Sequence, residues 1–260
     1  MNLKLRPYQE ECLESIHSYY SKGINRQLVQ MATGAGKTVV FANLIAQKQC
    51  RTLVLANTCE LLDQAKDKIQ MICPDIEVGI LKANRKELDK RVVISSIQSA
   101  RQPETLAEFQ KQEFSLCIYD ESHHAPSSSS KHILSELGFL APSNKLLVGF
   151  TATPFRTDNK CLGEIFKEVV YKKTIKDIIS IGFLCKPIGI RISSDLDLST
   201  VKTVNGDFVS TSLASVMNTS EMNDLVVNTY IEQANSRKTV CFCVTVSHAK
   251  NLAETFKNRG

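Results

Sequence analysis

The sequence predicts an α/β fold with a mostly parallel sheet that is covered by helices on both faces. Two observations support this prediction. Short apolar runs that are typical of buried strands occur at residues 28–31, 52–56, 91–96, 114–119 and 145–150. Segments with apolar residues at helical spacing, residues 39–49 and 61–69, follow the first two runs. Continuous apolar strands that alternate with helices favour a parallel sheet buried on both faces.

Length and composition indicate a globular protein of about two domains. The chain has 260 residues, of which 43% are hydrophobic and 23% are charged, and domains usually hold about 150 residues. The net charge of +5 permits a polyanionic partner without requiring one. No apolar run approaches the ~18 residues of a membrane helix, so we expect no membrane partner. Residues 1–10 show no targeting segment.

The nine cysteines are an odd number and none forms a Cys-x-x-Cys pair. This usage is typical of reduced thiols in an intracellular protein, in the nucleus, the cytoplasm or the mitochondrial matrix. A zinc site is not expected, because His123 and His124 have no second ligand pair at the required spacing.

Residues 31–38 (MATGAGKT) lie between a predicted strand and a predicted helix, which is the context of a phosphate-binding loop. Gly34 and Gly36 allow several backbone N–H groups to face one point, and the helix adds its positive end. Lys37 would reach the β- and γ-phosphates of ATP, and the Thr38 hydroxyl would bind Mg²⁺. A glycine-rich turn with an incidental lysine is the alternative. The candidate nucleotide-binding residues are Thr33, Gly34, Ala35, Gly36, Lys37 and Thr38.

Asp120 and Glu121 directly follow a predicted strand. Ligands of open parallel sheets bind beyond the carboxyl ends of the strands, so both carboxylates are expected near the phosphate loop. Asp120 suits Mg²⁺, directly or through water, and Glu121 suits orienting or deprotonating the attacking water. A solvated pair at the end of a strand is the alternative. The candidate catalytic residues are therefore Glu121 and Lys37, and the candidate metal ligands are Thr38 and Asp120.

The character of the sequence changes beyond residue 157, where a second α/β unit is expected to begin. The predicted elements are helices at residues 174–181 and 221–234, a loop or hairpin at 193–211, and strands at 186–192 and 239–244. We expect one domain at residues 1–172 and a linker with an incomplete second domain at residues 173–260.

Together these motifs resemble those of superfamily 2 helicases, in the DExH branch that includes type III restriction subunits and related mitochondrial helicases. Residues 120–123 (DESH) are similar to the DExH motif, and Met31 stands where the strict phosphate-loop pattern has glycine, as in helicase-type ATPases. The resemblance implies a RecA-like P-loop NTPase domain at residues 1–172. It also implies the start of a second RecA-like domain, since residues 241–249 resemble the fourth motif.

The resemblance also implies roles for further residues. Arg6 and Gln9 would contact adenine. His123, Thr151 and Thr153 would couple the state of ATP to the grip on nucleic acid. The candidate nucleic-acid contacts are Thr58, Ser96, Gln98 and Arg156. The family usually has a His-Arg pair where this chain has Asn57 and Thr58.

The implied function is that of an ATP- and Mg²⁺-dependent helicase or translocase that acts on nucleic acid, with DNA favoured over RNA. One alternative is a truncated, catalytically weak ATP-binding fragment with a binding or regulatory role. Another is an unrelated phosphate-loop enzyme such as a small-molecule kinase, which leaves the turn at residues 151–154 unexplained. The fifth and sixth motifs of the family, which carry arginines of the ATP site, are not found in residues 1–260, so we expect poor hydrolysis by this chain alone.

Overall fold

The structure, a computed structural model, describes residues 4–57, 60–82, 85–153, 162–194, 196–204, 206–234 and 237–259. The chain divides into two compact units, Met1–Lys186 and Pro187–Gly260. Helix α7 (Ile175–Ser180) belongs to the first unit. The functional boundary expected between residues 172 and 173 stays a prediction.

The first unit is built on an eight-stranded sheet with the strand order β4-β3-β5-β2-β6-β7-β1-β8. Every neighbouring pair of strands is parallel except the β3–β4 pair. The prediction of a mostly parallel sheet is therefore confirmed, and each of the five apolar runs contributes a strand. The strands are β1 (Arg26–Met31), β2 (Thr52–Ala56), β3 (Val78–Lys82), β4 (Arg85–Lys86), β5 (Val92–Ser96), β6 (Leu116–Asp120), β7 (Leu146–Thr151) and β8 (Glu168–Lys173).

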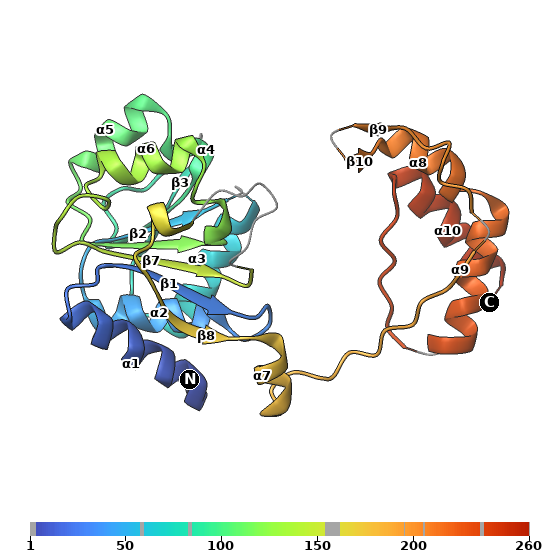
Figure 1. Cartoon of the computed structure of the whole chain (residues 1–260). Coiled ribbons are helices and arrows are strands. Elements are labelled where there is room, and N and C mark those ends of the chain that lie inside the picture. The colour runs from blue at the N-terminus through green and yellow to red at the C-terminus, as the bar shows by residue number, and fades with distance from the viewer. Residues whose placement is uncertain are drawn as a thin grey trace. The chain divides into compact units, whose positions relative to one another are not determined.

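Helices cover both faces of this sheet, as predicted (Figure 1). One face carries α1 (Pro7–Ser21), α2 (Lys37–Lys48) and α3 (Glu60–Ile72), and the other carries α4 (Ile97–Ala100), α5 (Pro103–Gln110) and α6 (Ser128–Glu136). Successive side chains of a strand point to opposite faces. In β6, accordingly, Leu116 and Ile118 join the core beneath α1–α3, whereas Cys117 and Tyr119 join the core beneath α4–α6. Alternation therefore explains why the strands read as continuous apolar runs.

The serine-rich segment at residues 125–131 has the composition of a polar loop, but its second half is helical, because α6 begins at Ser128. The Ser127 side chain accepts a hydrogen bond from the Ser130 N–H, which caps the helix. Ile133 and Leu134 then bury the helix against the sheet. Burial of these residues outweighs the weak helix propensity of a serine run.

The second unit contains three helices and a short hairpin among its described residues. These elements are β9 (Thr203–Val204), β10 (Asp207–Phe208), α8 (Ser210–Met217), α9 (Ser220–Ala234) and α10 (Val246–Asn258). The hairpin and the helix expected at residues 221–234 are confirmed. The strands predicted at residues 186–192 and 239–244 are wrong for the described residues, since neither segment pairs with another strand. Phe242 remains 97% exposed, and a strand without a neighbour is not stable in water.

The cysteines are free thiols throughout the described part of the chain. Burial raises the pKa of the Cys12 and Cys117 thiols well above their ordinary value, so these two side chains act as small apolar core residues. None of the helices described for this chain is long and apolar enough to cross a bilayer.

Candidate functional site

The three segments with chemical motifs meet at one edge of the sheet. Strand β7 lies between β6 and β1, with Phe150 opposite Asp120 and Thr151 opposite Gln30. The carboxyl ends of parallel strands lie at the same edge. The phosphate loop after β1, the acidic pair after β6 and the polar turn after β7 are therefore side by side.

Glycine is required at two positions of the phosphate loop. Gly34 and Gly36 have φ angles of 81° and 83°, a left-handed conformation that residues with a Cβ adopt only with strain. Gly36 also precedes α2 as its N-cap. A Cβ atom on Gly36 would lie 2.5 Å from Gln9 Nε2. Both the backbone angle and the approach of Gln9 therefore disfavour a larger residue at position 36.

Gln9 links the first helix to the phosphate loop. Its Nε2 donates to the Ala35 carbonyl oxygen at 3.1 Å, and its Oε1 accepts from the Arg6 N–H at 3.0 Å. The Tyr8 hydroxyl donates to the same Ala35 oxygen at 2.9 Å. Both ends of the Gln9 amide thus have partners within the protein. A contact between Gln9 and adenine requires these hydrogen bonds to be exchanged.

Two residues near the loop were missed by the sequence analysis. The Phe183 ring packs edge-on against Tyr8, with ring centroids 5.3 Å apart, and the Arg6 guanidinium lies 4.5 Å from its centroid. Leu184 Cδ2 is 3.1 Å from where a Cβ of Gly34 would lie. Both residues follow α7, far from the motifs in sequence and without a motif of their own. Only the fold brings them to the phosphate loop.

Lys37 and Glu121 form an ion pair, with Lys37 Nζ 3.0 Å from Glu121 Oε1. The lysine side chain is 11% exposed and the Glu121 side chain is 36% exposed, so solvent screens the pair in part. Glu121 has a φ angle of 49°, and strained non-glycine residues of this kind cluster at functional sites. A phosphate that binds Lys37 has to compete with the Glu121 carboxylate.

Asp120 has a pKa raised above its usual range, chiefly by burial and then by the charge of Glu121. Its Oδ1 accepts a hydrogen bond from the Glu121 N–H at 3.0 Å. Two adjacent carboxylates, one of them poorly solvated, are stabilised by a cation. Among the described residues no three His, Cys, Asp or Glu side chains converge on a metal site. This arrangement fits Mg²⁺, which binds one or two carboxylates together with substrate phosphates.

His123 joins the acidic pair to the turn after β7. Its Nδ1 lies 3.2 Å from Thr151 Oγ1 and 3.4 Å from Glu121 Oε2. Thr151 Oγ1 donates to the Thr153 carbonyl oxygen and accepts from the Thr153 N–H. The tautomer of His123 decides which of the two atoms donates in the His123–Thr151 contact. Thr153 takes part through its main chain, and its side chain is exposed.

The candidate nucleic-acid contacts have different surroundings. Ser96 is buried, and its Oγ accepts from the Ser99 N–H at 3.1 Å to cap α4. Gln98 is exposed in the first turn of that helix. Ser96 ends β5 opposite Ala56 of β2. Thr58 and Arg156 lie outside the described residues.

Comparison with known proteins agrees with this geometry. Residues 2–156 match the family described as "Type III restriction enzyme, res subunit". The chain belongs to this family. The matched residues include the phosphate loop, the acidic pair and the turn after β7, so all three motifs of the candidate site lie in the part of the chain that matches the family.

Two curated relatives align along almost the whole chain. The putative ATP-dependent helicase IRC3 of Saccharomyces cerevisiae is 30% identical over 272 residues, which cover 98% of this chain and 39% of that protein. The putative mitochondrial ATP-dependent helicase irc3 of Schizosaccharomyces pombe is 32% identical, covering 99% of this chain and 44% of that protein. The chain therefore spans less than half of either relative. Its resemblance to ATP-dependent helicases is confirmed.

A solved structure shows the same fold. A nuclease-deletion mutant of the Type ISP restriction-modification enzyme LlaGI, in complex with a DNA substrate mimic, aligns with a TM-score of 0.56 at 20% identity. The alignment covers 70% of this chain and 21% of that one. The first unit is thus the RecA-like α/β fold expected for a superfamily 2 core.

Proposed function

We propose that this chain forms the ATP-binding part of a DNA helicase or translocase that uses ATP with Mg²⁺. The observation that carries the proposal is the unbroken series of contacts from Lys37 through Glu121 and His123 to Thr151. It connects the residue expected to hold phosphates with the turn expected to respond to them. A small-molecule kinase has no use for such a connection.

The Lys37–Glu121 ion pair suggests how binding starts the response. The triphosphate draws the Lys37 ammonium away from Glu121, because phosphate oxygens carry more negative charge. Glu121 is then free to orient and deprotonate the attacking water. Since His123 lies within reach of both Glu121 and Thr151, a change in the position of Glu121 changes the contact at Thr151.

Thr38 and Asp120 are the residues that would hold Mg²⁺. The metal would neutralise the β- and γ-phosphates as charge develops on them. The raised pKa of Asp120 reflects the cost of burying its charge beside Glu121, and a bound cation would offset that cost. At the other end of the nucleotide, Arg6 and Gln9 are proposed to contact adenine, with Phe183 beside them.

DNA is the proposed partner. The LlaGI structure contains a DNA substrate mimic, and the curated relatives are named helicases. Ser96, Gln98, Thr58 and Arg156 are proposed to meet the phosphodiester backbone, which gives binding that is independent of sequence and steeply dependent on salt. Strand separation and tracking along a duplex are both compatible with this machinery. A mitochondrial location is proposed from the name of the S. pombe relative.

Thermodynamic linkage between ATP and DNA tests the proposal without depending on turnover. A fluorescent ATP analogue is titrated into the protein with Mg²⁺, with and without duplex DNA. We expect DNA to change nucleotide affinity by about 5-fold or more, the lower end of ordinary coupling. Lys37→Ala should abolish tight nucleotide binding, because it removes the main positive charge at the phosphates.

Thr151→Val is the decisive variant, since it removes the hydroxyl that contacts His123 while keeping the shape of the side chain. It should bind nucleotide and DNA separately but lose the linkage between them. Thr153→Ala is the matched control, because the Thr153 groups that contact Thr151 belong to the main chain. Equal linkage in wild type and Thr151→Val would show that these contacts do not couple the sites.

A further inference from the structure

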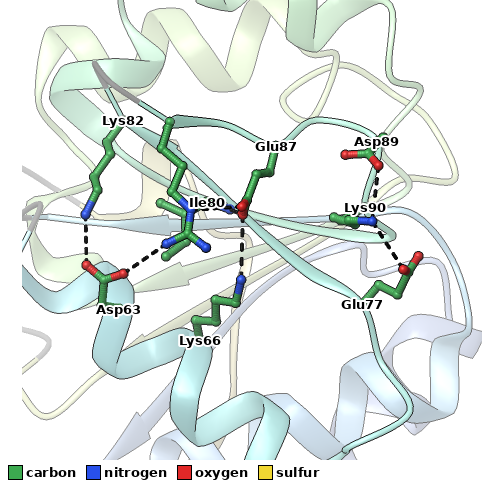
Figure 2. Close-up of polar contacts among 9 residues, drawn as sticks. Asp63, Lys66, Glu77, Ile80, Lys82, Glu87, Asp89 and Lys90 are labelled. Carbon is green, nitrogen blue, oxygen red and sulfur yellow. Dashed lines mark hydrogen bonds and ion pairs between the residues drawn. The ribbon is translucent and has the colours of Figure 1, made fainter.

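Two cations outside the ATP site share one carboxylate at the edge of the first unit. Lys82 ends β3 and Arg85 begins β4, while Asp63 lies on the first turn of α3. Lys82 Nζ is 2.9 Å from Asp63 Oδ2, and Arg85 Nη1 is 3.4 Å from Asp63 Oδ1. Figure 2 shows Lys82 directed at this carboxylate from the end of its strand. The sequence analysis did not single out any of these residues.

The strand register places Lys82 in line with the proposed backbone contacts. Leu81 lies opposite Ser95 in the parallel β3–β5 pair, so Lys82 follows beside Ser96. Ser96 in turn lies opposite Ala56 of β2. Neighbouring strands are about 4.8 Å apart. The strands β3, β5 and β2 therefore end side by side at the same edge of the sheet. Lys82 lies next to Ser96 at this edge, where the backbone of DNA is proposed to bind.

Structural stabilisation alone does not account well for this arrangement. The side chains of Lys82, Arg85 and Asp63 are 35%, 34% and 53% exposed, and exposed ion pairs contribute little to stability. The hydrogen bond from Lys82 is the main cause that lowers the pKa of Asp63, so the carboxylate stays ionised. An ionised carboxylate between two accessible cations has the charge and the acceptor oxygens of a phosphodiester group.

Arg85 is also held from a second side. Its Nε donates to Glu87 Oε1 at 2.9 Å, and Glu87 Oε2 accepts from the Ile80 N–H at 3.0 Å. These bonds, that of Arg85 first, lower the pKa of Glu87 to about 2, so Glu87 keeps its charge at neutral pH. The Arg85 guanidinium therefore stays in place when another anion replaces Asp63 at Nη1.

We propose that Lys82 and Arg85 bind the phosphodiester backbone of double-stranded DNA, and that Asp63 orients both cations and competes with phosphate when DNA is absent. The inference rests on the proposed function and adds a contact surface to it. Binding exchanges the Asp63 carboxylate for phosphate oxygens at both cations and forms no covalent bond. Glu87 keeps the Arg85 guanidinium oriented during the exchange.

The chain offers a matched control at the other end of the same strands. Lys90 Nζ lies 3.2 Å from Glu77 and 3.2 Å from Asp89, again one exposed ion-pair cluster (Figure 2). Glu77 precedes β3 and Lys90 precedes β5, so this cluster lies at the amino edge of the sheet. Removing its charge changes the net charge of the protein without touching the proposed surface.

Fluorescence anisotropy of a fluorescein-labelled DNA duplex, titrated with the whole 260-residue chain at several salt concentrations, tests the inference. The double variant Lys82→Gln/Arg85→Gln should weaken binding, and the slope of log K against log salt should become shallower by about 1.8, because each phosphate contact contributes about 0.9. Lys90→Gln should leave the slope unchanged. Lys82→Arg keeps the charge and should keep the slope.

Asp63→Asn separates competition from a structural role. It removes the competing charge but keeps the size of the side chain, so duplex binding should tighten by about threefold or more. If Asp63 only fastened the hairpin to α3, the variant would melt at a lower temperature and bind no better, which would overturn the inference. An unchanged salt slope in the double variant would also overturn it. If the wild-type chain bound no duplex at all, the proposed function would fail first, and this surface with it.

Discussion

Replacing Gly36 by alanine tests the link between Gln9 and the phosphate loop. The φ angle of 83° costs a residue with a Cβ about 1–2 kcal/mol, and the smaller entropy of the unfolded alanine chain returns about 0.4–1 kcal/mol. The new Cβ would lie 2.5 Å from Gln9 Nε2, so Gln9 has to move and lose its hydrogen bond to Ala35, at about 1 kcal/mol. Gly36→Ala should therefore destabilise the first unit by about 2 kcal/mol.

Gly23→Ala is the control for this prediction. Gly23 has a φ angle of 82° but nothing within 4 Å of the position of a Cβ. Gly23→Ala introduces the same backbone strain but displaces no neighbouring side chain. It should therefore lower the stability of the first unit by about 1 kcal/mol. Urea unfolding followed by circular dichroism measures both, since the chain has no tryptophan. In a Gln9→Ala background the two substitutions should cost the same, because the displaced group is gone.

The reasoning is refuted if Gly36→Ala costs no more than Gly23→Ala in the wild-type background. It is also refuted if the difference between them persists when Gln9 is alanine. Fluorescent-ATP titration of the same variants should show weaker nucleotide binding for Gly36→Ala only.

Two further predictions concern the acidic pair. In a protein extended to the length of its relatives, Glu121→Gln should slow ATP hydrolysis on the order of 10²-fold or more. The variant should bind ATP at least as tightly as wild type, because Lys37 is released from its ion pair. Steady-state turnover within twofold of wild type would show that Glu121 is not the base. Affinity for Mg²⁺-ATP should rise with pH through the raised pKa of Asp120 and fall as the carboxyl becomes protonated at lower pH. Asp120→Asn should show weak binding with a flat pH profile, and a wild-type profile retained in this variant would assign the titration to another group.

Short-range chemistry allowed the sequence to predict much of the site. The glycines at positions 34 and 36 are required by local backbone angles, and Lys37 follows them on the first turn of a helix. The acidic pair comes directly after a strand whose apolar run is continuous because both of its faces are buried. These features depend on residues that are close together in the chain, so they can be recognised from the sequence alone.

Other residues acquire their surroundings only through distant contacts. The role of Gln9 at adenine stays a prediction, and only the fold shows that its amide lies over Gly36 and bonds Ala35. Phe183 has no motif, and reaches Tyr8 because the chain returns through β8 to the strand beside the phosphate loop. Lys82 acquires its position from the pairing of β3 with β5. These pairings join residues that are far apart in the chain, and no local pattern records them.

The sequence by itself determined five of the eight strands of the first unit, the chemistry of the phosphate loop and the acidic pair, and the family, but it did not predict β3, β4 and β8. Tertiary structure decided the order of the strands, which puts β7 between β6 and β1 and brings Thr151 within reach of His123. It also decided that residues 239–243 form no strand, since an apolar run becomes a strand only when another strand lies beside it. The physical reason is the same in both cases. Apolar periodicity records how much of a segment is buried, whereas pairing depends on which distant segment offers its hydrogen-bonding groups.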